Sequence, residues 1–101
     1  MAKNKRPILK DGDALKFDGS NNEVLGYDAD FFKAYTEDLE TKRRLTKVTG
    51  SNINARYYDT KVKKPYWDFL IPKRRLNTVV RILSKSKKWV IREGTVYPNL
   101  P

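Results

Sequence analysis

Three side chains near the middle of the chain, Asn52, Asn54 and Arg56, are of the types that recognise the edges of DNA bases. An asparagine amide can form two hydrogen bonds to adenine, and an arginine guanidinium can form two to guanine in the major groove. If residues 51–60 form the second helix of a helix–turn–helix, these three side chains are candidates for base recognition.

An excess of cations surrounds these three residues. Residues 1–40 contain six Lys or Arg and nine Asp or Glu, a net charge of −3, whereas residues 41–101 contain sixteen and three, a net charge of +13. A surplus of this size implies a positive surface that attracts polyanions, although a solvated basic face without a partner is the alternative. The candidate phosphate contacts are Lys42, Arg43, Arg44, Lys47, Lys61, Lys63, Lys64, Lys73, Arg74, Arg75, Arg81, Lys85, Lys87, Lys88 and Arg92.

The sequence contains neither Cys nor His, which excludes several kinds of chemistry. Thiolate or imidazole metal sites, His-dependent triads and His-based acid or base catalysis are impossible without these residues. A metal-dependent nuclease would have to use Asp28, Asp30, Asp59 or Asp68, but nothing in their spacing fixes a two-metal site. We therefore expect a protein that is not an enzyme and that holds no metal or other cofactor.

The first element expected to position the cations is a helix over residues 28–49. Asp28 or Asp30 can cap its N-terminus, its first turns are acidic and its last turns are basic, as the helix macrodipole favours. Gly50 follows as a C-terminal stop. The expected buried stripe of this helix consists of Phe31, Phe32, Tyr35 and Leu39.

The second element is a helix over residues 72–88, which is the clearest prediction. Its apolar residues recur at i, i+3, i+4 and i+7, the spacing of one helix face. They are Leu76, Val79, Val80 and Leu83. Arg74, Arg81 and Lys85 lie at i, i+7 and i+11 on another face. The helix carries no carboxylate that could pair with them at i+4, which favours an external anion as their partner.

The remaining segments are expected to form strands, with one ambiguity. Residues 8–27 predict a hairpin, and residues 89–101 predict a strand and a turn. Residues 45–60 allow two interpretations: a helix–turn–helix, or a loop and a strand over Ala55–Thr60 that pairs with Tyr66–Ile71. Aromatic residues favour the strand. In that case some rings must be exposed among cations, an arrangement that suits stacking on unpaired bases of RNA or of single-stranded DNA.

Together these elements predict an α+β fold, a small antiparallel sheet with two main helices packed on it. The alternative is a winged helix-turn-helix. The length predicts one domain over residues 8–101, preceded by a basic flexible arm at residues 1–7 that carries Lys3, Lys5 and Arg6. Because no signal segment or long apolar run is present, we expect a cytoplasmic protein without a membrane partner.

Two segments carry a resemblance to a known class of protein. LTKVTGSNINARYY, residues 45–58, and KWVIREGTVY, residues 88–97, resemble the helix–turn–helix and the wing of small basic DNA-binding proteins of plasmids and phages. This class includes accessory proteins of conjugative origin-of-transfer complexes. The resemblance implies a non-catalytic homodimer that binds short duplex DNA sites and acts as an accessory or regulatory factor. Duplex DNA is therefore preferred over RNA as the partner, and a protein-binding phage factor is a further alternative.

Overall fold

Strands build most of the fold, and the first three along the chain bury every second side chain. The computed structural model describes residues 9–61 and 63–98, so the predicted arm with Lys3, Lys5 and Arg6 lies outside the described residues. The strands are β1 (Ala14–Phe17), β2 (Glu23–Gly26), β3 (Phe31–Thr36), β4 (Asn52–Asp59), β5 (Lys64–Pro72), β6 (Trp89–Arg92) and β7 (Thr95–Pro98). The helices are α1 (Leu39–Thr46), the 3-10 helix η1 (Lys73–Arg75) and α2 (Leu76–Ser84).

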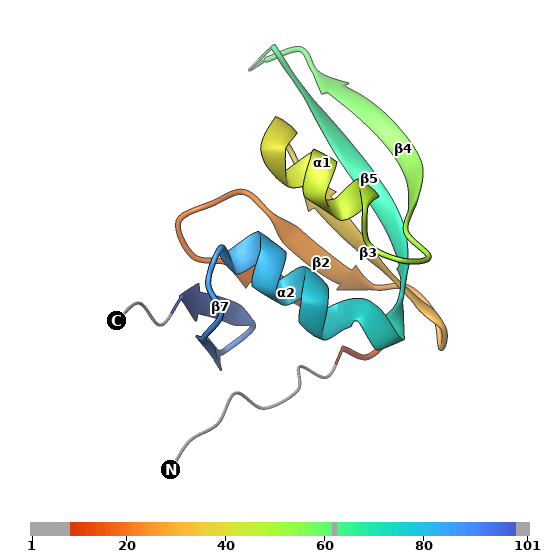
Figure 1. The fold of residues 1–101 in the computed structure, drawn as a ribbon. Helices are drawn as coiled ribbons and strands as arrows, with labels where there is room; N and C mark the ends of the chain where they lie inside the picture. The colour runs from red at the N-terminus through yellow and green to blue at the C-terminus, as the bar shows by residue number, and fades with distance from the viewer. Residues whose placement is uncertain (1–8, 62, 99–101) are drawn as a thin grey trace.

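The seven strands of the described residues belong to one sheet, which corrects the predicted fold class (Figure 1). Their order is β4-β5-β3-β2-β1-β7-β6, and the sheet is mixed because β1 runs parallel to β7 while the other neighbours are antiparallel. The prediction of a small antiparallel sheet is therefore wrong. The parallel pair between β1 and β7 joins segments that are far apart in the sequence, so no local pattern indicates it.

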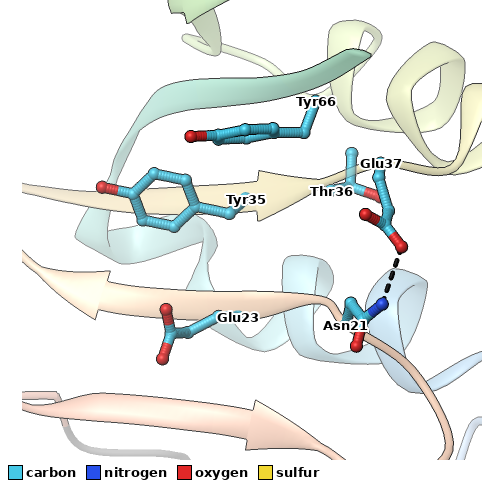
Figure 2. A pocket seen from close by; sticks show the side chains of 6 residues that line it. All are labelled: Asn21, Glu23, Tyr35, Thr36, Glu37 and Tyr66. Atoms are coloured by element: carbon cyan, nitrogen blue, oxygen red, sulfur yellow. Dashed lines mark hydrogen bonds between the residues drawn. The ribbon is translucent and has the colours of Figure 1, made fainter. Parts of the chain in front are cut away.

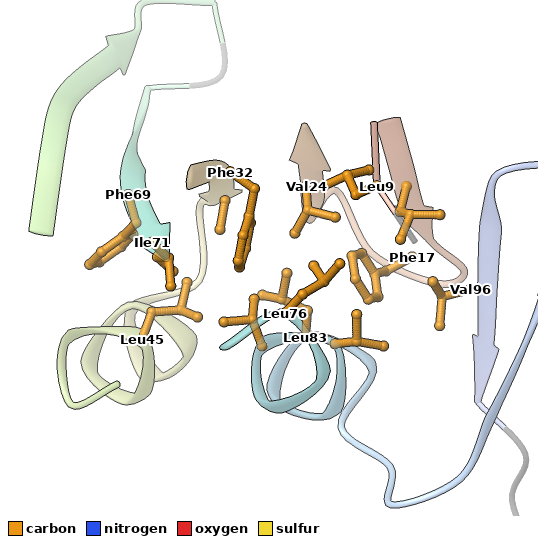
Figure 3. Close-up of a cluster of buried hydrophobic side chains, with 14 of the residues drawn as sticks. Leu9, Phe17, Val24, Phe32, Leu45, Phe69, Ile71, Leu76, Leu83 and Val96 are labelled. Carbon is orange, nitrogen blue, oxygen red and sulfur yellow. The ribbon is translucent and has the colours of Figure 1, made fainter. Parts of the chain in front are cut away.

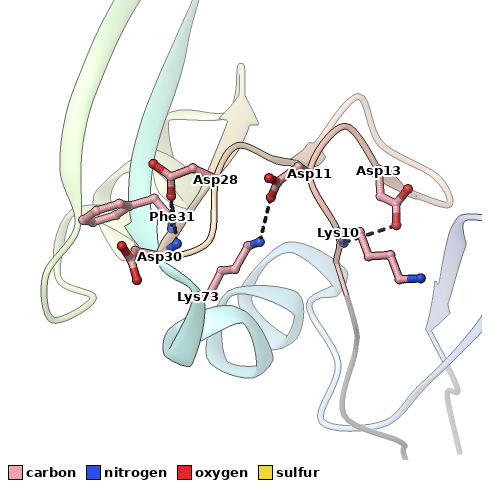
Figure 4. Close-up of polar contacts among 7 residues, drawn as sticks. All are labelled: Lys10, Asp11, Asp13, Asp28, Asp30, Phe31 and Lys73. Atoms are coloured by element: carbon pink, nitrogen blue, oxygen red, sulfur yellow. Dashed lines mark hydrogen bonds and ion pairs between the residues drawn. The ribbon is translucent and has the colours of Figure 1, made fainter.

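Strand β3 occupies the first half of the predicted helix over residues 28–49. Its side chains alternate between buried and half-buried positions, the period of a strand rather than of a helix. The Asp28 carboxylate accepts backbone N–H groups, as predicted for a cap, but they belong to Asp30 and Phe31, each at 2.8 Å (Figure 4). These bonds close a turn before β3. The helix begins only after Asp38, whose carboxylate accepts from the Thr41 N–H at 2.8 Å.

The two helices lie side by side on one face of the sheet, and the hydrophobic core fills the space between the two layers (Figure 3). The predicted apolar stripe of α2, which is Leu76, Val79, Val80 and Leu83, is buried there as expected. The helix itself is shorter than predicted: residues 73–75 form η1, and Lys85 ends α2 with a left-handed backbone at φ +56°. We call the side of the sheet covered by α1 and α2 the helical face and the opposite side the open face.

Residues 52–59 and 64–72 form the two strands of a long hairpin, which confirms the strand interpretation and excludes the helix–turn–helix. Strands β4 and β5 pair from Asn52–Leu70 to Asp59–Lys64, with a bulge between Ile53 and Ala55. The hairpin extends beyond the other strands in Figure 1. The expected exposure of some of its rings is also confirmed, since Tyr57 is 43% and Tyr58 is 61% exposed.

The loop between α1 and β4 packs closely against the end of β5. Gly50 adopts φ +82°, and a Cβ atom there would lie only 2.8 Å from Cγ of Pro72. Glycine is the residue that tolerates both this backbone conformation and this close approach. Residues 89–101 were predicted to form a strand and a turn; within the described residues they form two paired strands, β6 and β7, around Glu93 and Gly94, which both have positive φ. Within residues 9–61 and 63–98, no helix has the length and apolar character needed to cross a membrane.

Candidate nucleic-acid interface

The two helices run antiparallel, and their cations therefore combine into one surface. The start of α1 lies near the end of α2. The charge of Lys85 therefore helps to lower the pKa of Asp38, after the larger effect of the hydrogen bonds from Thr41. The loop after α1 lies near the start of α2, since a Cβ atom on Gly50 would be 3.9 Å from a guanidinium nitrogen of Arg74. Cations at the end of α1 and at the start of α2 are consequently neighbours.

The cations of this surface point away from the core because the apolar side chains of the same helices point into it. Arg44 and Lys47 at the end of α1, and Arg74 and Arg81 on η1 and α2, are exposed. Among the described residues, none of these four cations has a carboxylate oxygen within 4.0 Å. An unpaired exposed cation keeps its full attraction for an external anion.

Trp67 joins the helical layer to the β4–β5 hairpin. The ammonium nitrogen of Lys42 on α1 lies 5.7 Å from the centre of the Trp67 ring, within the range of a cation–π contact. Arg56 of β4 is paired in register with Trp67, so both side chains lie on the helical face. The basic surface therefore continues from α1 to the hairpin, at whose tip Lys61, Lys63 and Lys64 are exposed.

Besides Lys42, three of the predicted phosphate contacts are paired or partly buried within the protein. Lys73 forms an ion pair with Asp11 at 3.2 Å, and its backbone N–H donates to the carbonyl of Asp30 (Figure 4). Arg43 lies 3.9 Å from Glu40 in an exposed pair. Arg75 is half-buried, and its Nε atom is buried without a hydrogen-bond partner among the described residues. Lys73 and Arg75 thus belong to the junction between β5 and α2 more than to the outer surface.

The cations that follow α2 extend the surface toward the other edge of the sheet. Lys85, Lys87 and Lys88 are exposed in the loop between α2 and β6. Arg92 is exposed at the end of β6, in the last pair before the hairpin turn. Since β6 is an edge strand, these cations lie far along the sheet order from the β4–β5 hairpin.

The three predicted base-recognition residues are not brought together. They occupy every second position of a strand, which would place them on one face, but the bulge between Ile53 and Ala55 changes the face that the later residues occupy. Arg56 lies on the helical face, whereas the amide of Asn54 donates to the Asp68 carboxylate at 3.1 Å on the open face. The Asn52 amide is exposed and donates to the carbonyl of Gly50 at 3.4 Å. The hypothesis that one recognition helix presents all three is therefore wrong.

The open face carries a polar group that sequence reasoning treated only as a nuclease candidate. Asp68 is 0% exposed; its Oδ2 atom lies 3.8 Å from the Lys33 ammonium, and its Oδ1 atom has no hydrogen-bond partner among the described residues. Lys33 also lies 4.9 Å from the ring centre of Tyr27. In the described part of the chain no three Asp or Glu side chains gather into a possible metal site.

Tyrosines surround Asp68 on the open face. The rings of Tyr57 and Tyr66 stack at 4.8 Å between centres. Burial raises the pKa of Tyr35, and the negative charge of Asp68 raises this pKa further, followed by Tyr57, Glu23 and Tyr66. Tyr35 was predicted in the buried stripe of a helix. The alternation in FFKAYT is the signal that could have placed it on the outer side of a strand.

No protein-family model matches the chain, and no curated protein or solved structure shows significant similarity to it. The resemblance of residues 45–58 and 88–97 to plasmid and phage DNA-binding proteins therefore stays a prediction. Its structural implication, a winged helix, is excluded by the strand at residues 52–59.

Proposed function

We propose that this protein is a non-catalytic nucleic-acid-binding protein that holds duplex DNA against its helical face. The observation that carries the proposal is a set of exposed cations on this one side that form no ion pair among the described residues: Arg44, Lys47, Arg56, Arg74 and Arg81. Phosphate contacts of this kind supply most of the affinity of sequence-independent binding and fix the orientation of the protein on the duplex.

The β4–β5 hairpin gives the proposed interface a shape that fits DNA. The major groove admits a two-stranded β-ribbon, and several DNA-binding proteins use such ribbons. The hairpin projects from the sheet in Figure 1, and its tip carries Lys61, Lys63 and Lys64. In the proposed complex the ribbon follows a groove, while the cations of α1 and α2 contact the adjacent phosphates.

The biological role that we propose follows from the sequence resemblance alone. In that role the protein is an accessory or regulatory factor of a plasmid or phage. A homodimer would place two ribbons on one duplex, and strands β4 and β6 are the two edges of the sheet at which a second chain could pair.

The proposal is tested by fluorescence anisotropy with a labelled duplex at several salt concentrations. If about six phosphates are contacted, the slope of log affinity against log salt should be near −5. In the double variant Arg74→Ala/Arg81→Ala we expect a slope that is less steep by about 2, near −3. We also expect the affinity for the duplex to fall by about tenfold or more. The matched control is Lys10→Ala/Lys16→Ala, which removes the same charge from exposed positions outside the two helices.

Two results would contradict the proposal. An affinity that does not change with salt would exclude phosphate contacts as its source. An equal loss of affinity in the two double variants would show that binding depends only on the net charge of the protein. The helical face would then not be the binding surface.

A second candidate, binding of RNA or of single-stranded DNA, is favoured by the exposed rings of the hairpin. Tyr58 is the most exposed large apolar residue described, and it lies beside Arg56 on β4. Stacking of a base on such a ring is worth about 1–3 kcal/mol. In a competition between a duplex and a single strand of equal length, preference for the single strand and its loss in Tyr58→Ala would replace the duplex proposal.

A further inference from the structure

The open face contains a pocket bordered by carboxylates and aromatic rings, whereas the helical face is basic. The pocket has a volume of about 390 Å³ and is lined by Asn21, Glu23, Tyr35, Thr36, Glu37 and Tyr66 (Figure 2). This volume lies in the range of small-ligand sites, which is about 300–1,000 Å³. Two carboxylates and two tyrosine rings, contributed by β2, β3, β5 and the residue that follows β3, thus border one hollow in a protein whose net charge is +10.

Buried hydrogen bonds hold the wall of this pocket in place. The Thr36 hydroxyl donates to the Asn22 side-chain carbonyl at 2.7 Å, and both residues are buried. The Thr36 hydroxyl also accepts from the Asp38 N–H at 3.1 Å. Next to them, the Asn21 amide donates to the Glu37 carboxylate at 2.7 Å, which orients that carboxylate (Figure 2). The turn before β2 and the end of β3 are therefore fixed relative to each other.

The carboxylates of the pocket have no cationic partner. Within the described ranges neither Glu23 nor Glu37 has a Lys or Arg nitrogen within 4.0 Å, although the chain has 22 Lys and Arg residues. Lys16 is paired in register with Glu23 on the neighbouring strand, but its side chain is exposed and forms no ion pair with it. The negative charge at this position is therefore available to an external group.

A second, independent observation is an unsatisfied carboxylate oxygen on the same side of the sheet. Asp68 is the register partner of Tyr35 and is completely buried. Its Oδ2 atom contacts Lys33 and Asn54, but its Oδ1 atom has no partner among the described residues. A buried carboxylate oxygen of this kind favours a cation or a donor close by. The raised pKa of Tyr35, caused by burial and then by Asp68, Tyr57, Glu23 and Tyr66, is consistent with a negative potential at the pocket wall.

We infer that this pocket binds the guanidinium group of an arginine side chain presented by a partner protein. A guanidinium is planar, forms two parallel hydrogen bonds to a carboxylate and stacks on aromatic rings. Glu23 and Glu37 supply the carboxylates. Tyr35 and Tyr66 supply the rings, and the Tyr66 ring is supported from the other strand by Tyr57. A nucleotide fits this pocket less well, because its phosphate would be repelled by both carboxylates.

The test is an NMR titration of the full-length protein with a capped Gly-Arg-Gly peptide. We expect saturable shifts of the ring signals of Tyr35 and Tyr66, and no saturable shifts with the same peptide carrying citrulline, which is neutral but nearly the same shape. In Glu23→Gln/Glu37→Gln the affinity should fall at least tenfold, while thermal unfolding stays close to that of the unchanged protein. The control Asp18→Asn/Asp30→Asn removes the same charge from exposed turns and should bind as the unchanged protein does.

Several results would overturn the inference. Equal binding of the citrulline peptide, or an equal loss in the control variant, would show that no guanidinium site exists. Displacement of the peptide by spermidine at lower concentration would assign the pocket to a free polyamine, and displacement by a nucleoside monophosphate would assign it to a base. Because the duplex affinity of Glu23→Gln/Glu37→Gln is expected to be unchanged, failure here leaves the proposed DNA interface untouched.

Discussion

The helical face and the open face of the sheet differ in what covers them and in the charge that they expose. Two antiparallel helices close the helical face and carry unpaired cations such as Arg44, Arg74 and Arg81 outward. No helix in the described ranges covers the open face, which carries tyrosines, the pair of Lys33 and Asp68, the exposed Lys16 and the carboxylates of a pocket. One small domain therefore presents a basic surface on its helical face and a pocket lined by carboxylates on its open face.

Strand alternation, as well as position in the sequence, decides which face of the sheet carries a given charge. The basic part of the chain, residues 41–101, also supplies Tyr57, Tyr66 and Asp68 to the open face. Conversely, Lys33 comes from the acidic part and lies beside Asp68. A count of charge along the chain identifies the excess but does not show which face carries it.

The largest expected effect comes from breaking the packing of the helical face. Phe69 is fully buried there, so Phe69→Ala should lower the free energy of unfolding by about 3–5 kcal/mol. Its matched control is Tyr57→Ala in the paired strand, which removes a half-exposed ring whose stack on Tyr66 is worth about 0.5–1.5 kcal/mol. Urea denaturation of both variants measures the difference. Equal losses would mean that the open face is packed as firmly as the helical face.

Part of this fold is predictable because its signals are local. The apolar spacing of Leu76, Val79, Val80 and Leu83 predicts a helix, and the same four residues are buried in α2. The turn formers between β1 and β2, and the aromatic residues of β4 and β5, likewise indicate hairpins that are present. In each case the pattern and its partner lie close together in the chain.

The parts of the fold that could not be predicted depend on a competition between two local sequence patterns, or on contacts between residues that are far apart in the sequence. The segment from Phe31 to Tyr35 satisfies both a helix stripe and a strand alternation, and its pairing with β2 and β5 decides between them. The pocket on the open face needs β2, β3 and β5 side by side, so neither Glu23 nor Tyr66 indicates it alone. The cations were identifiable, but the internal ion pair of Lys73 with Asp11 was not.

A second way to disturb the helical face is to separate its two helices. In Gly50→Ala the new Cβ would meet Pro72, and the backbone at φ +82° is strained for alanine. We expect a loss of about 2–4 kcal/mol in the free energy of unfolding, combining backbone strain with overpacking. Gly19→Ala is the matched control, because Gly19 has φ +79° but open space around it, and should lose about 1–2 kcal/mol. Equal losses would show that the contact with Pro72 is unimportant.

A smaller effect is expected at the start of α1. Asp38 accepts hydrogen bonds from the backbone N–H and the hydroxyl of Thr41, so Asp38→Ala should lower the free energy of unfolding by about 0.5–2 kcal/mol. Asp38→Asn keeps a capping oxygen and should lose less. The same hydrogen bonds, and then Lys85, lower the pKa of Asp38 below its ordinary value of 3.8.

The lowered pKa of Asp38 gives this cap a defined pH dependence. The stabilisation is present above the ordinary value of 3.8 and is lost as the pH falls through the lower pKa of the folded protein. Chemical denaturation across the acid range should therefore show a decline in the unchanged protein that is weaker in Asp38→Asn. A decline of the same size in both proteins would mean that other carboxylates cause it.

The smallest expected effect concerns Tyr35 and leaves the fold intact. Burial, and then the charge of Asp68, raise the pKa of Tyr35 above 10.0, so ionisation of this ring opposes folding and the free energy of unfolding should fall as the pH rises above that value. In Asp68→Asn the repulsion between the two anions disappears, and the pKa of Tyr35 should fall. Glu23→Gln should lower it less, because Glu23 contributes less than Asp68. An NMR pH titration of the Tyr35 ring measures both changes. A pKa that does not move in Asp68→Asn would show that Asp68 does not create the negative potential of the open face, and it would remove one of the two observations that support the arginine pocket.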